Sequence, residues 1–368
     1  MERIPLFRPL IREQAVQAVA EVLRSGWLGL GPKTASFEKA LADYVGISYC
    51  VGLNSCTSAL HLGLRLLDLP AGSEVITTAL TFVSTNHVIL YENCRPVFAD
   101  VEPDTGNLDI HSVSDRITER TGAIMLMHYA GYPCDIEQFY ALARQRNIPI
   151  VEDCAHACGA EYKGKRIGSH GDIHAFSFHP VKNLPMGDGG ALTIRSDEYH
   201  RRLKRLRWLG ISADTFQRTG PEGYRWNYDV SEVGFKYHMN DVQAAIGLAQ
   251  LDWLDRDNAR RASIAAQYRQ QLSGVPGIRL LEYKNDRKSS CHLFCILAEQ
   301  RDALIDKLGV NQVDVSVHYP RNDRYSMYEE HELPNTEYFW RHVISLPMHL
   351  VLTDNHVEYI TDIIRKGW

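Results

Sequence analysis

The sequence predicts an α/β protein whose large domain contains a mainly parallel, seven-stranded sheet, followed by a smaller C-terminal α+β domain. Three observations support this fold. Between about residues 35 and 195, short apolar runs alternate with segments whose apolar residues recur at helical spacing. The short runs are almost continuously apolar, which is typical of parallel strands buried on both faces. A long helical pattern then separates this region from the C-terminal segment.

The expected strands and helices alternate regularly along the large domain. Strands are expected at residues 50–53, 74–78, 95–101, 122–129, 148–153, 173–178 and 190–194. Helices are expected at residues 34–45, directly after Asn54, and at 81–93, 110–119 and 135–146. The turn between the last two strands is too short for a helical crossover, so one of these strands is expected to run antiparallel to the rest.

The remaining segments are expected to form an arm, a loop, a bridging helix and a small domain. The expected division is an N-terminal arm at 1–12, a large domain at 13–238, a bridging helix at 239–271 and a small domain at 272–368. Residues 200–235 are rich in Arg, Trp, Tyr and Gly and lack a clear period, which indicates a long functional loop. Asn240 is a suitable N-cap for the bridging helix.

The composition argues against several classes of protein. Of the 368 residues, 45% are hydrophobic and 23% are charged, as in ordinary soluble globular proteins. The net charge of −5 offers no basic excess for nucleic acid. No apolar run is long enough for a transmembrane helix, and the N-terminus lacks the apolar core of a signal peptide. We therefore expect a cytoplasmic protein that binds neither nucleic acid nor membrane.

Cysteine and histidine are frequent but do not form a recognisable metal motif. Two pairs among the eight cysteines, 154/158 and 291/295, have the spacing C-x3-C, whereas zinc sites usually have C-x2-C with a second pair nearby. The sixteen histidines include no H-E-x-x-H pattern. Reduced, buried thiols are the expected state of these cysteines in a cytosolic protein. No metal is therefore expected.

Candidate binding residues follow the strands at their carboxyl ends, where open α/β sheets bind ligands. The stretch after strand 50–53, residues 54–58, is rich in small hydroxylic residues and opens a helix. A helix N-terminus of this kind suits a phosphate, although the same residues would also serve as a simple cap. Asp153 ends strand 148–153, and burying such an acid is costly unless it is paired, whether with a ligand or in a salt bridge.

Lys182 lies just after strand 173–178 and before a glycine-rich turn. A lysine in a desolvated cleft has a lowered pKa, because burial disfavours its charged form, and is a candidate for Schiff-base chemistry. A loop lysine is otherwise simply solvated. Together, a phosphate site, a strand-end acid and a loop lysine are the parts that pyridoxal 5′-phosphate requires.

On these residues the sequence resembles the DegT/DnrJ/EryC1/StrS aminotransferases, the sugar-nucleotide branch of the fold-type I enzymes that use pyridoxal 5′-phosphate. The most specific stretch is 151–192, where an acid, a serine, a lysine and GDGG stand at the family's relative spacing. Further matching stretches lie at 25–44, 52–60, 81–85, 95–109, 234–251 and 344–349. The resemblance implies transfer of an amino group, by analogy from L-glutamate, to a nucleotide-linked keto-deoxy sugar. The amino sugar would serve surface polysaccharide or natural-product glycosylation.

The resemblance also implies roles for individual residues. Lys182 matches the lysine that bonds to the cofactor and moves the proton, and Asp153 matches the acid that pairs with the pyridinium nitrogen. Phe82 matches the aromatic residue that stacks on the pyridine ring, and His156 matches a position near its phenolic oxygen. The positions that match phosphate contacts are Cys56, Thr57 and Ser177.

One stretch departs from the family pattern. The family often has G-Y-N-Y-R-M where this chain has G-F-K-Y-H-M at 234–239. The family's Asn reaches the phosphate of the neighbouring subunit's cofactor, so the resemblance implies a homodimer with a shared active site and places Lys236 in that position. The family often has an Arg at the position of His238, so a contact of this residue with a substrate carboxylate is not expected here.

A second polar segment follows an expected strand in the small domain. The candidate substrate contacts in it are His318, Arg321 and Asn322. An ordinary surface turn is the alternative interpretation of the same segment.

Other activities remain open on the sequence alone. An aldolase or a desulfurase of fold-type I would use the same lysine and acid, although a desulfurase needs a catalytic cysteine in a mobile loop. A cofactor-binding regulator without turnover would need a DNA-binding module or basic patch, and neither is visible. The family's dehydratases have histidine in place of the lysine, whereas this chain has Lys182. The sugar, the nucleotide and the aminated carbon stay undetermined.

Overall fold

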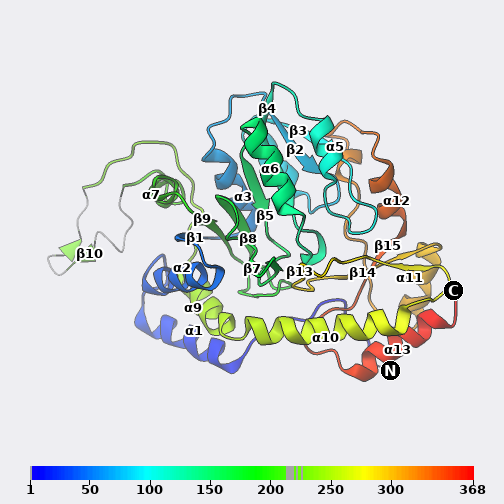
Figure 1. Ribbon diagram of the computed structural model, residues 1–368. Helices are drawn as coiled ribbons and strands as arrows, with labels where there is room; N and C mark the ends of the chain where they lie inside the picture. The colour runs from blue at the N-terminus through cyan, green and yellow to red at the C-terminus, as the bar shows by residue number, and fades with distance from the viewer. Residues whose placement is uncertain (1, 213–218, 221–222, 225–226) are drawn as a thin grey trace.

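A twisted seven-stranded sheet with helices on both faces forms the larger part of the computed structural model, which describes residues 2–212, 219–220, 223–224 and 227–368 (Figure 1). In spatial order the strands are β1 (Tyr49–Leu53), β9 (Gly190–Ile194), β8 (Ile173–Ser177), β5 (Ile150–Asp153), β4 (Thr121–Met127), β2 (Glu74–Thr78) and β3 (Arg95–Ala99). Strand β9 is antiparallel to both of its neighbours, and the other pairings are parallel. This confirms the predicted fold class, including its one antiparallel strand.

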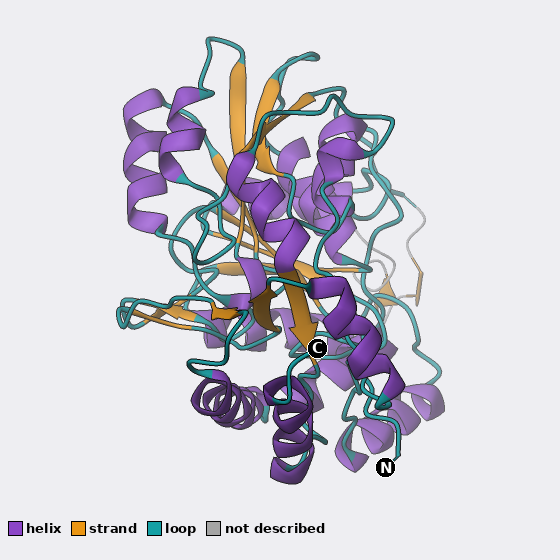
Figure 2. Ribbon diagram, turned by 90° about the vertical axis from the view of Figure 1, so that its right-hand side faces the viewer, coloured by secondary structure: helices purple, strands orange, loops and turns teal. Residues whose placement is uncertain are grey.

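The helices cover the sheet because successive strand residues point to opposite faces. Ile124 and Phe176 belong to the core on one face, and their neighbours Met125 and Ala175 belong to the core on the other. The first face is covered by α2 (Pro32–Val45), α6 (Ile136–Arg146) and α9 (Asp241–Leu251). The second is covered by α3 (Cys56–Arg65), α4 (Ser84–Tyr91) and α7 (Asp197–Leu206). Figure 2 shows this layering, with helices on both sides of the large sheet.

The predicted cap at Asn240 is confirmed. Its side chain accepts a hydrogen bond from the N–H of Gln243, whose side chain in turn bonds the N–H of Asn240. The predicted single helix over 239–271 is, however, two helices, α9 and α10 (Leu254–Leu272). The N–H of Trp253 bonds the carbonyl of Gln250, three residues back rather than four, and this interrupts the regular helix.

The C-terminal part packs a small antiparallel sheet against helices. Its strands are ordered β12 (Ile278–Leu280), β14 (Phe294–Ala298), β15 (Val343–Leu346). Its helices are α10, α11 (Arg301–Val310), α12 (Pro334–His342) and α13 (Asp354–Arg365). The N-terminal arm joins this part, since Ile4 pairs with Val313 and Leu6 accepts the N–H of Met348. Both chain ends therefore lie beside it (Figure 1).

Short elements complete the fold. The helix α1 (Glu13–Ser25) packs on α9, and α5 (Ile110–Asp115) contacts α6. Strand β13 (Arg287–Lys288) pairs with β6 (Glu161–Tyr162), which pairs with β7 (Lys165–Arg166), so this ribbon ties the two parts of the chain together. The remaining elements are β10 (Thr219–Gly220), β11 (Gly223–Tyr224) and the 3₁₀ turns η1 (Tyr129–Gly131) and η2 (Asn322–Arg324).

The loop predicted over 200–235 is wrong at its start, because α7 continues through Leu206. Only Leu203 and Leu206 of this helix are buried. Most of its other residues are charged, so the sequence has too few apolar positions to show a helical repeat. Residues 213–218, 221–222 and 225–226 of the predicted loop lie outside the described residues. Within the described part of the chain, no helix combines the length and the apolar composition needed to cross a bilayer.

Candidate active site

A cavity of about 360 Å³ opens at the carboxyl ends of the parallel strands. Its volume falls in the range of small-molecule sites, about 300–1,000 Å³. Segments that follow β1, β2, β5 and β8 line it, together with one segment from the C-terminal part. The lining residues are Ser55, Cys56, Thr57, Thr81, Phe82, Ser84, Thr85, Met127, Asp153, Ala155, His156, Ser177, His179, Val181, Lys182, Asp188, His318 and Tyr319.

Lys182 brings an amine into this cavity from the loop after β8. Burial of the amine lowers the pKa of Lys182 from its ordinary value of 10.5 to about 8, although the nearby Cys56 and Asp153 act in the opposite direction. A lysine with this pKa is partly neutral near pH 7–8. It can therefore act as a nucleophile or accept a proton under ordinary conditions.

Asp153 ends β5 and presents a buried carboxylate to the cavity. Its Oδ2 accepts a hydrogen bond from the Thr85 hydroxyl at 2.8 Å, and its Oδ1 accepts one from the N–H of Ala155 at 3.0 Å. Burial nevertheless raises the pKa of Asp153, because these two bonds and the Lys182 charge only partly offset the lost hydration. A cationic group bound in the cavity would stabilise this carboxylate.

The start of helix α3 forms another wall of the cavity. Ser55 caps the helix by accepting a hydrogen bond from the N–H of Ser58. The N–H groups of Cys56 and Thr57, in the first turn, have no acceptor within the helix and are available to an anion. Gly190 makes room for this arrangement, since a Cβ there would lie 2.3 Å from the carbonyl of Ser55. Ser177 adds a hydroxyl to the same lining.

Aromatic and imidazole groups form the remaining lining. His156 Nε2 is 2.8 Å from the Tyr319 hydroxyl, and its buried Nδ1 has no hydrogen-bond partner among the described residues. Burial lowers the pKa of His156 well below its ordinary value, so the ring is neutral. Phe82 lines the cavity and is 59% exposed. This open ring face and the unpartnered Nδ1 are both available to a bound aromatic group.

The structure brings most of the residues predicted from the sequence into this one cavity. They are Cys56, Thr57, Phe82, Asp153, His156, Ser177, Lys182 and His318. Sequence reasoning missed Thr85 and Tyr319 as members of the site. Thr85 lies three residues after the predicted Phe82 and Tyr319 directly follows the predicted His318, so the neighbourhood of the predicted residues was the available signal.

Three predicted residues do not line the cavity. The Lys236 amine lies over the Trp208 ring, 3.4 Å from its centre. The buried Arg321 forms ion pairs with Asp323 at 2.6 Å and with Glu337 at 2.7 Å. Asn322 is fully buried, and its N–H bonds the carbonyl of Ala79. Neither Arg321 nor Asn322 therefore belongs to the exposed surface turn that was the alternative interpretation.

The arrangement fits a ligand with three features. An anionic group suits the free N–H groups of α3, and a protonated nitrogen suits the Asp153 carboxylate. A reactive carbonyl suits the Lys182 amine. The unpartnered His156 Nδ1 indicates a further polar contact.

Comparison with known proteins gives consistent matches along the whole chain. The DegT/DnrJ/EryC1/StrS aminotransferase family matches residues 9–365. The UDP-4-amino-4-deoxy-L-arabinose–oxoglutarate aminotransferase of Shewanella sediminis is 35% identical, over 99% of this chain and 98% of its own. The crystal structure of AtS13 from Actinomadura melliaura is 38% identical with a TM-score of 0.94, over 100% of both chains. The sugar aminotransferase CalS13 from Micromonospora echinospora is 33% identical with a TM-score of 0.92, over 99% of this chain and 100% of its own.

Proposed function

Because the chain belongs to the DegT/DnrJ/EryC1/StrS aminotransferase family, we propose that it transfers an amino group from L-glutamate to the keto group of a nucleotide-linked deoxy sugar. The observation that carries this proposal is the presence of the Lys182 amine and the Asp153 carboxylate in one cavity beside the start of α3. The name of the Shewanella sediminis relative supports the substrate pair, since it contains both a UDP-linked amino sugar and oxoglutarate.

The cofactor of this reaction is proposed to be pyridoxal 5′-phosphate. The N–H groups of Cys56 and Thr57 would hold its phosphate, with the Ser177 hydroxyl beside them. Asp153 would pair with its ring nitrogen, and Phe82 would cover its ring. The buried Nδ1 of His156 would meet its phenolic oxygen. When bound, the cofactor supplies an electron sink that stabilises negative charge on the donor's Cα.

The chain's own groups would hold charge and move the proton. Lys182 would attach the cofactor through its amine and, once released, take the proton from the donor's Cα. Its lowered pKa, about 8, keeps a usable fraction of the amine neutral. Asp153, stabilised by the Thr85 hydroxyl, would keep the ring nitrogen protonated. Both groups would act in both halves of the reaction, so ping-pong kinetics should follow.

The active site is proposed to be completed by a second subunit in a homodimer. Phe82 is 59% exposed beside the cavity, and the Lys236 amine lies away from it in its own chain. A partner subunit that covers Phe82 and supplies its own Lys236 to the phosphate end would account for both observations. The amine of Lys236 is a suitable phosphate contact because it adds a full positive charge.

Other chemistry at the same lysine is less well supported. A desulfurase requires a mobile catalytic cysteine, and the cysteine that lines the cavity, Cys56, lies in the first turn of α3. Burial also raises the pKa of the Cys56 thiol well above its ordinary value, which lowers the fraction of reactive thiolate. Amino transfer therefore fits the cavity better than sulfur transfer.

The test is an absorption spectrum of the protein loaded with pyridoxal 5′-phosphate, recorded before and after L-glutamate. We expect the visible band to bleach on addition of the donor and to return on addition of a keto-deoxy sugar nucleotide. A band that no amino donor changes would contradict the proposed amino transfer. The absence of any band after incubation with the cofactor would contradict the roles of Lys182 and Asp153.

A further inference from the structure

His292, from the segment before β14, reaches the reactive lysine from the C-terminal part of the chain. Its Nε2 lies 3.4 Å from the Lys182 amine, although the two residues are 110 positions apart in the sequence. His292 is 1% exposed, and its ring lies 4.3 Å from that of His156, between centres. His292 lies outside the stretches of the sequence that resemble the family's motifs.

The surrounding hydrogen bonds determine which ring nitrogen of His292 carries the hydrogen. The amide nitrogen of Asn183 donates to the Asn258 side-chain oxygen at 2.7 Å and to the Ser290 carbonyl at 2.8 Å. The Asn183 side-chain oxygen therefore faces His292 Nδ1, at 3.1 Å, and can only accept. Nδ1 must carry the hydrogen, so Nε2 of the neutral ring has a free lone pair directed at Lys182.

The neutral state of His292 agrees with its surroundings. Its burial, and the nearby positive charges of Lys182 and Arg261, lower the pKa of His292 well below its ordinary value. The titratable groups that influence Lys182 or are influenced by its charge are Cys56, Asp153, His156, His292 and His318. Of these, His292 makes the hydrogen bond to the amine.

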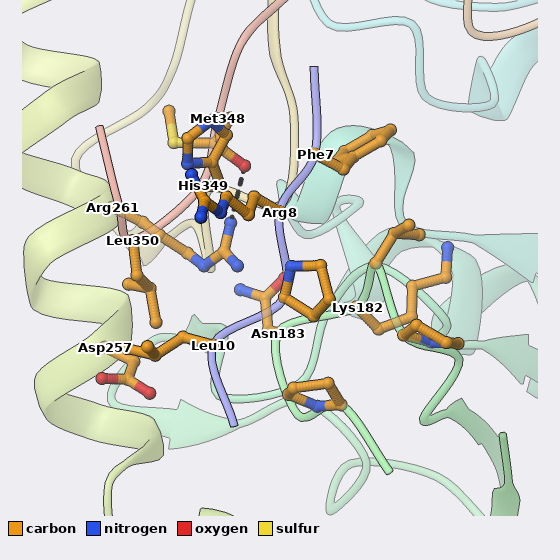
Figure 3. A pocket seen from close by; sticks show the side chains of 14 residues that line it. Phe7, Arg8, Leu10, Lys182, Asn183, Asp257, Arg261, Met348, His349 and Leu350 are labelled. Carbon is orange, nitrogen blue, oxygen red and sulfur yellow. Dashed lines mark hydrogen bonds between the residues drawn. The ribbon is translucent and has the colours of Figure 1, made fainter. Parts of the chain in front are cut away.

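The support of this histidine comes from three parts of the fold. Asn183 follows Lys182 on the loop after β8, Asn258 lies on α10, and Ser290 precedes β14. Asn258 is held in turn by the Cys158 carbonyl at 3.0 Å. Figure 3 shows Asn183 directed into a small pocket beside Arg261 and His349, while the Lys182 side chain leads away from it. These adjacent residues therefore differ in direction: the Asn183 side chain fixes the loop by its hydrogen bonds to Asn258 and Ser290, and the Lys182 side chain lines the cavity.

We propose that His292 is a positioning residue for the amino-transfer reaction: its Nε2 accepts a hydrogen bond from the Lys182 amine and holds that amine at the cavity wall. The inference rests on the proposed function. A neutral amine that donates one N–H to His292 keeps its lone pair free to take the proton from the donor's Cα. A carboxylate in the same place would stabilise the ammonium form and oppose this role. His292 itself stays neutral and exchanges no proton.

Two variants that differ by one methylene separate this role from a packing role. In His292→Asn the side-chain amide can still reach Asn183 but falls short of Lys182. In His292→Gln the side-chain oxygen can occupy the position of Nε2. The matched control is His349→Asn, which alters another buried histidine that bonds the Pro5 carbonyl rather than Lys182.

The first readout is the pH midpoint of Lys182 labelling by trinitrobenzenesulfonate in the cofactor-free full-length protein. Loss of an acceptor destabilises the ammonium form, so His292→Asn should lower the midpoint by about 0.5 unit or more. His292→Gln and His349→Asn should leave it within about 0.2 unit of wild type. Equal midpoints in His292→Asn and His349→Asn would overturn the proposal.

The second readout is the half-reaction of the loaded enzyme with L-glutamate and its α-deuterated form. His292→Asn should slow the half-reaction about tenfold or more and increase the isotope effect, with the KM for glutamate within about twofold. His292→Gln should recover most of the rate. A slowed His292→Asn enzyme with an unchanged isotope effect would contradict the role in proton transfer. Wild-type enzyme that transfers no amino group would instead contradict the proposed function.

A third measurement needs no variant and therefore no assumption about folding. The ¹⁵N shifts of His292 in the wild-type protein should show hydrogen on Nδ1 and none on Nε2. Hydrogen on Nε2 at neutral pH would overturn the proposal, because that nitrogen could not accept a bond from Lys182.

Discussion

The hydroxyl of Thr85 donates a hydrogen bond to the carboxylate of Asp153 at 2.8 Å, and both groups are buried. This bond joins the start of α4 to the end of β5, two segments that the sheet brings together at its carboxyl edge. Bonds to a charged acceptor are worth about 1.5–3 kcal/mol. The bond therefore stabilises the charged form of Asp153, whose pKa is raised by burial, and also fixes the orientation of its carboxylate.

Thr85→Val should weaken cofactor binding. The substitution keeps the shape of the side chain but removes the donor, so the pKa of Asp153 should rise further and its hold on a protonated ring nitrogen should weaken. We expect the Kd for pyridoxal 5′-phosphate to increase about tenfold, by fluorescence titration, which corresponds to about 1.4 kcal/mol. Thr361→Val, in α13, removes another buried hydroxyl and should leave this Kd unchanged. Equal affinities in both variants would argue against the role of Thr85.

The lowered pKa of Lys182 predicts a cost in stability that depends on pH. The folded value is about 8 against an ordinary 10.5, so the folded state disfavours the proton that the unfolded chain holds. This cost is fully present below pH 8 and disappears between about pH 8 and 10.5, so the wild-type protein should gain stability as the pH rises through that window.

Lys182→Met should therefore stabilise the cofactor-free protein while abolishing turnover. At pH 7 we expect a gain of about 1–3 kcal/mol in the free energy of unfolding, measured with urea, and a gain that shrinks above pH 8. Lys163→Met is the control, because its exposed amine has a raised pKa owing to its bond with Glu137. A gain for Lys182→Met that persisted unchanged to pH 10 would contradict the lowered pKa.

Much of the fold and part of the site could be predicted from the sequence. The short link between 173–178 and 190–194 was enough to predict the antiparallel strand, because a parallel pair needs a longer crossover. Lys182 and Asp153 could be placed together because parallel strands bring their carboxyl ends to one edge. The start of α3 and its cap could also be predicted, because the small hydroxylic residues at 54–58 are typical of a helix N-terminus.

Contacts between the two parts of the chain could not be predicted in the same way. His292 reaches Lys182 across 110 residues, and no periodicity or spacing encodes that approach. The substrate contact of Arg321 stays a prediction, because this residue does not line the cavity and is paired within the protein. Its polar surroundings suggested substrate contact, but two of the groups beside it, Asp323 and Glu337, are its ion-pair partners. A run of polar residues has the same appearance in a sequence whether they bind a ligand or one another.

Arg321→Met should reduce stability rather than substrate affinity. The substitution leaves the buried Asp323 carboxylate without its partner, which costs about 3–5 kcal/mol. The KM for the sugar nucleotide should stay within about twofold of wild type in any folded fraction. Arg324→Met removes the more exposed ion pairs of Arg324 with Glu330 and Glu337, leaves the buried Arg321–Asp323 pair in place, and should cost about 1 kcal/mol or less. A large rise in KM without loss of stability would restore Arg321 as a substrate contact.

Mixing two inactive variants tests the proposed shared active site. If Lys236 serves the partner subunit's phosphate site, then Lys182→Ala and Lys236→Ala each damage a different part of that site. A mixed dimer would place both substitutions in one of its two sites and leave the other intact. We expect Lys182→Ala to lack activity and Lys236→Ala to bind the cofactor about tenfold or more weakly, since a charged phosphate contact is lost.

Co-expression of the two variants with different tags allows the mixed dimer to be isolated. Its activity at limiting cofactor should approach half that of the wild type, because one of two sites is complete. If both lysines served the same chain's site, each site of the mixed dimer would carry one substitution and activity at limiting cofactor would stay low. A monomer in sedimentation analysis, at a concentration where the enzyme is active, would rule out the shared site altogether.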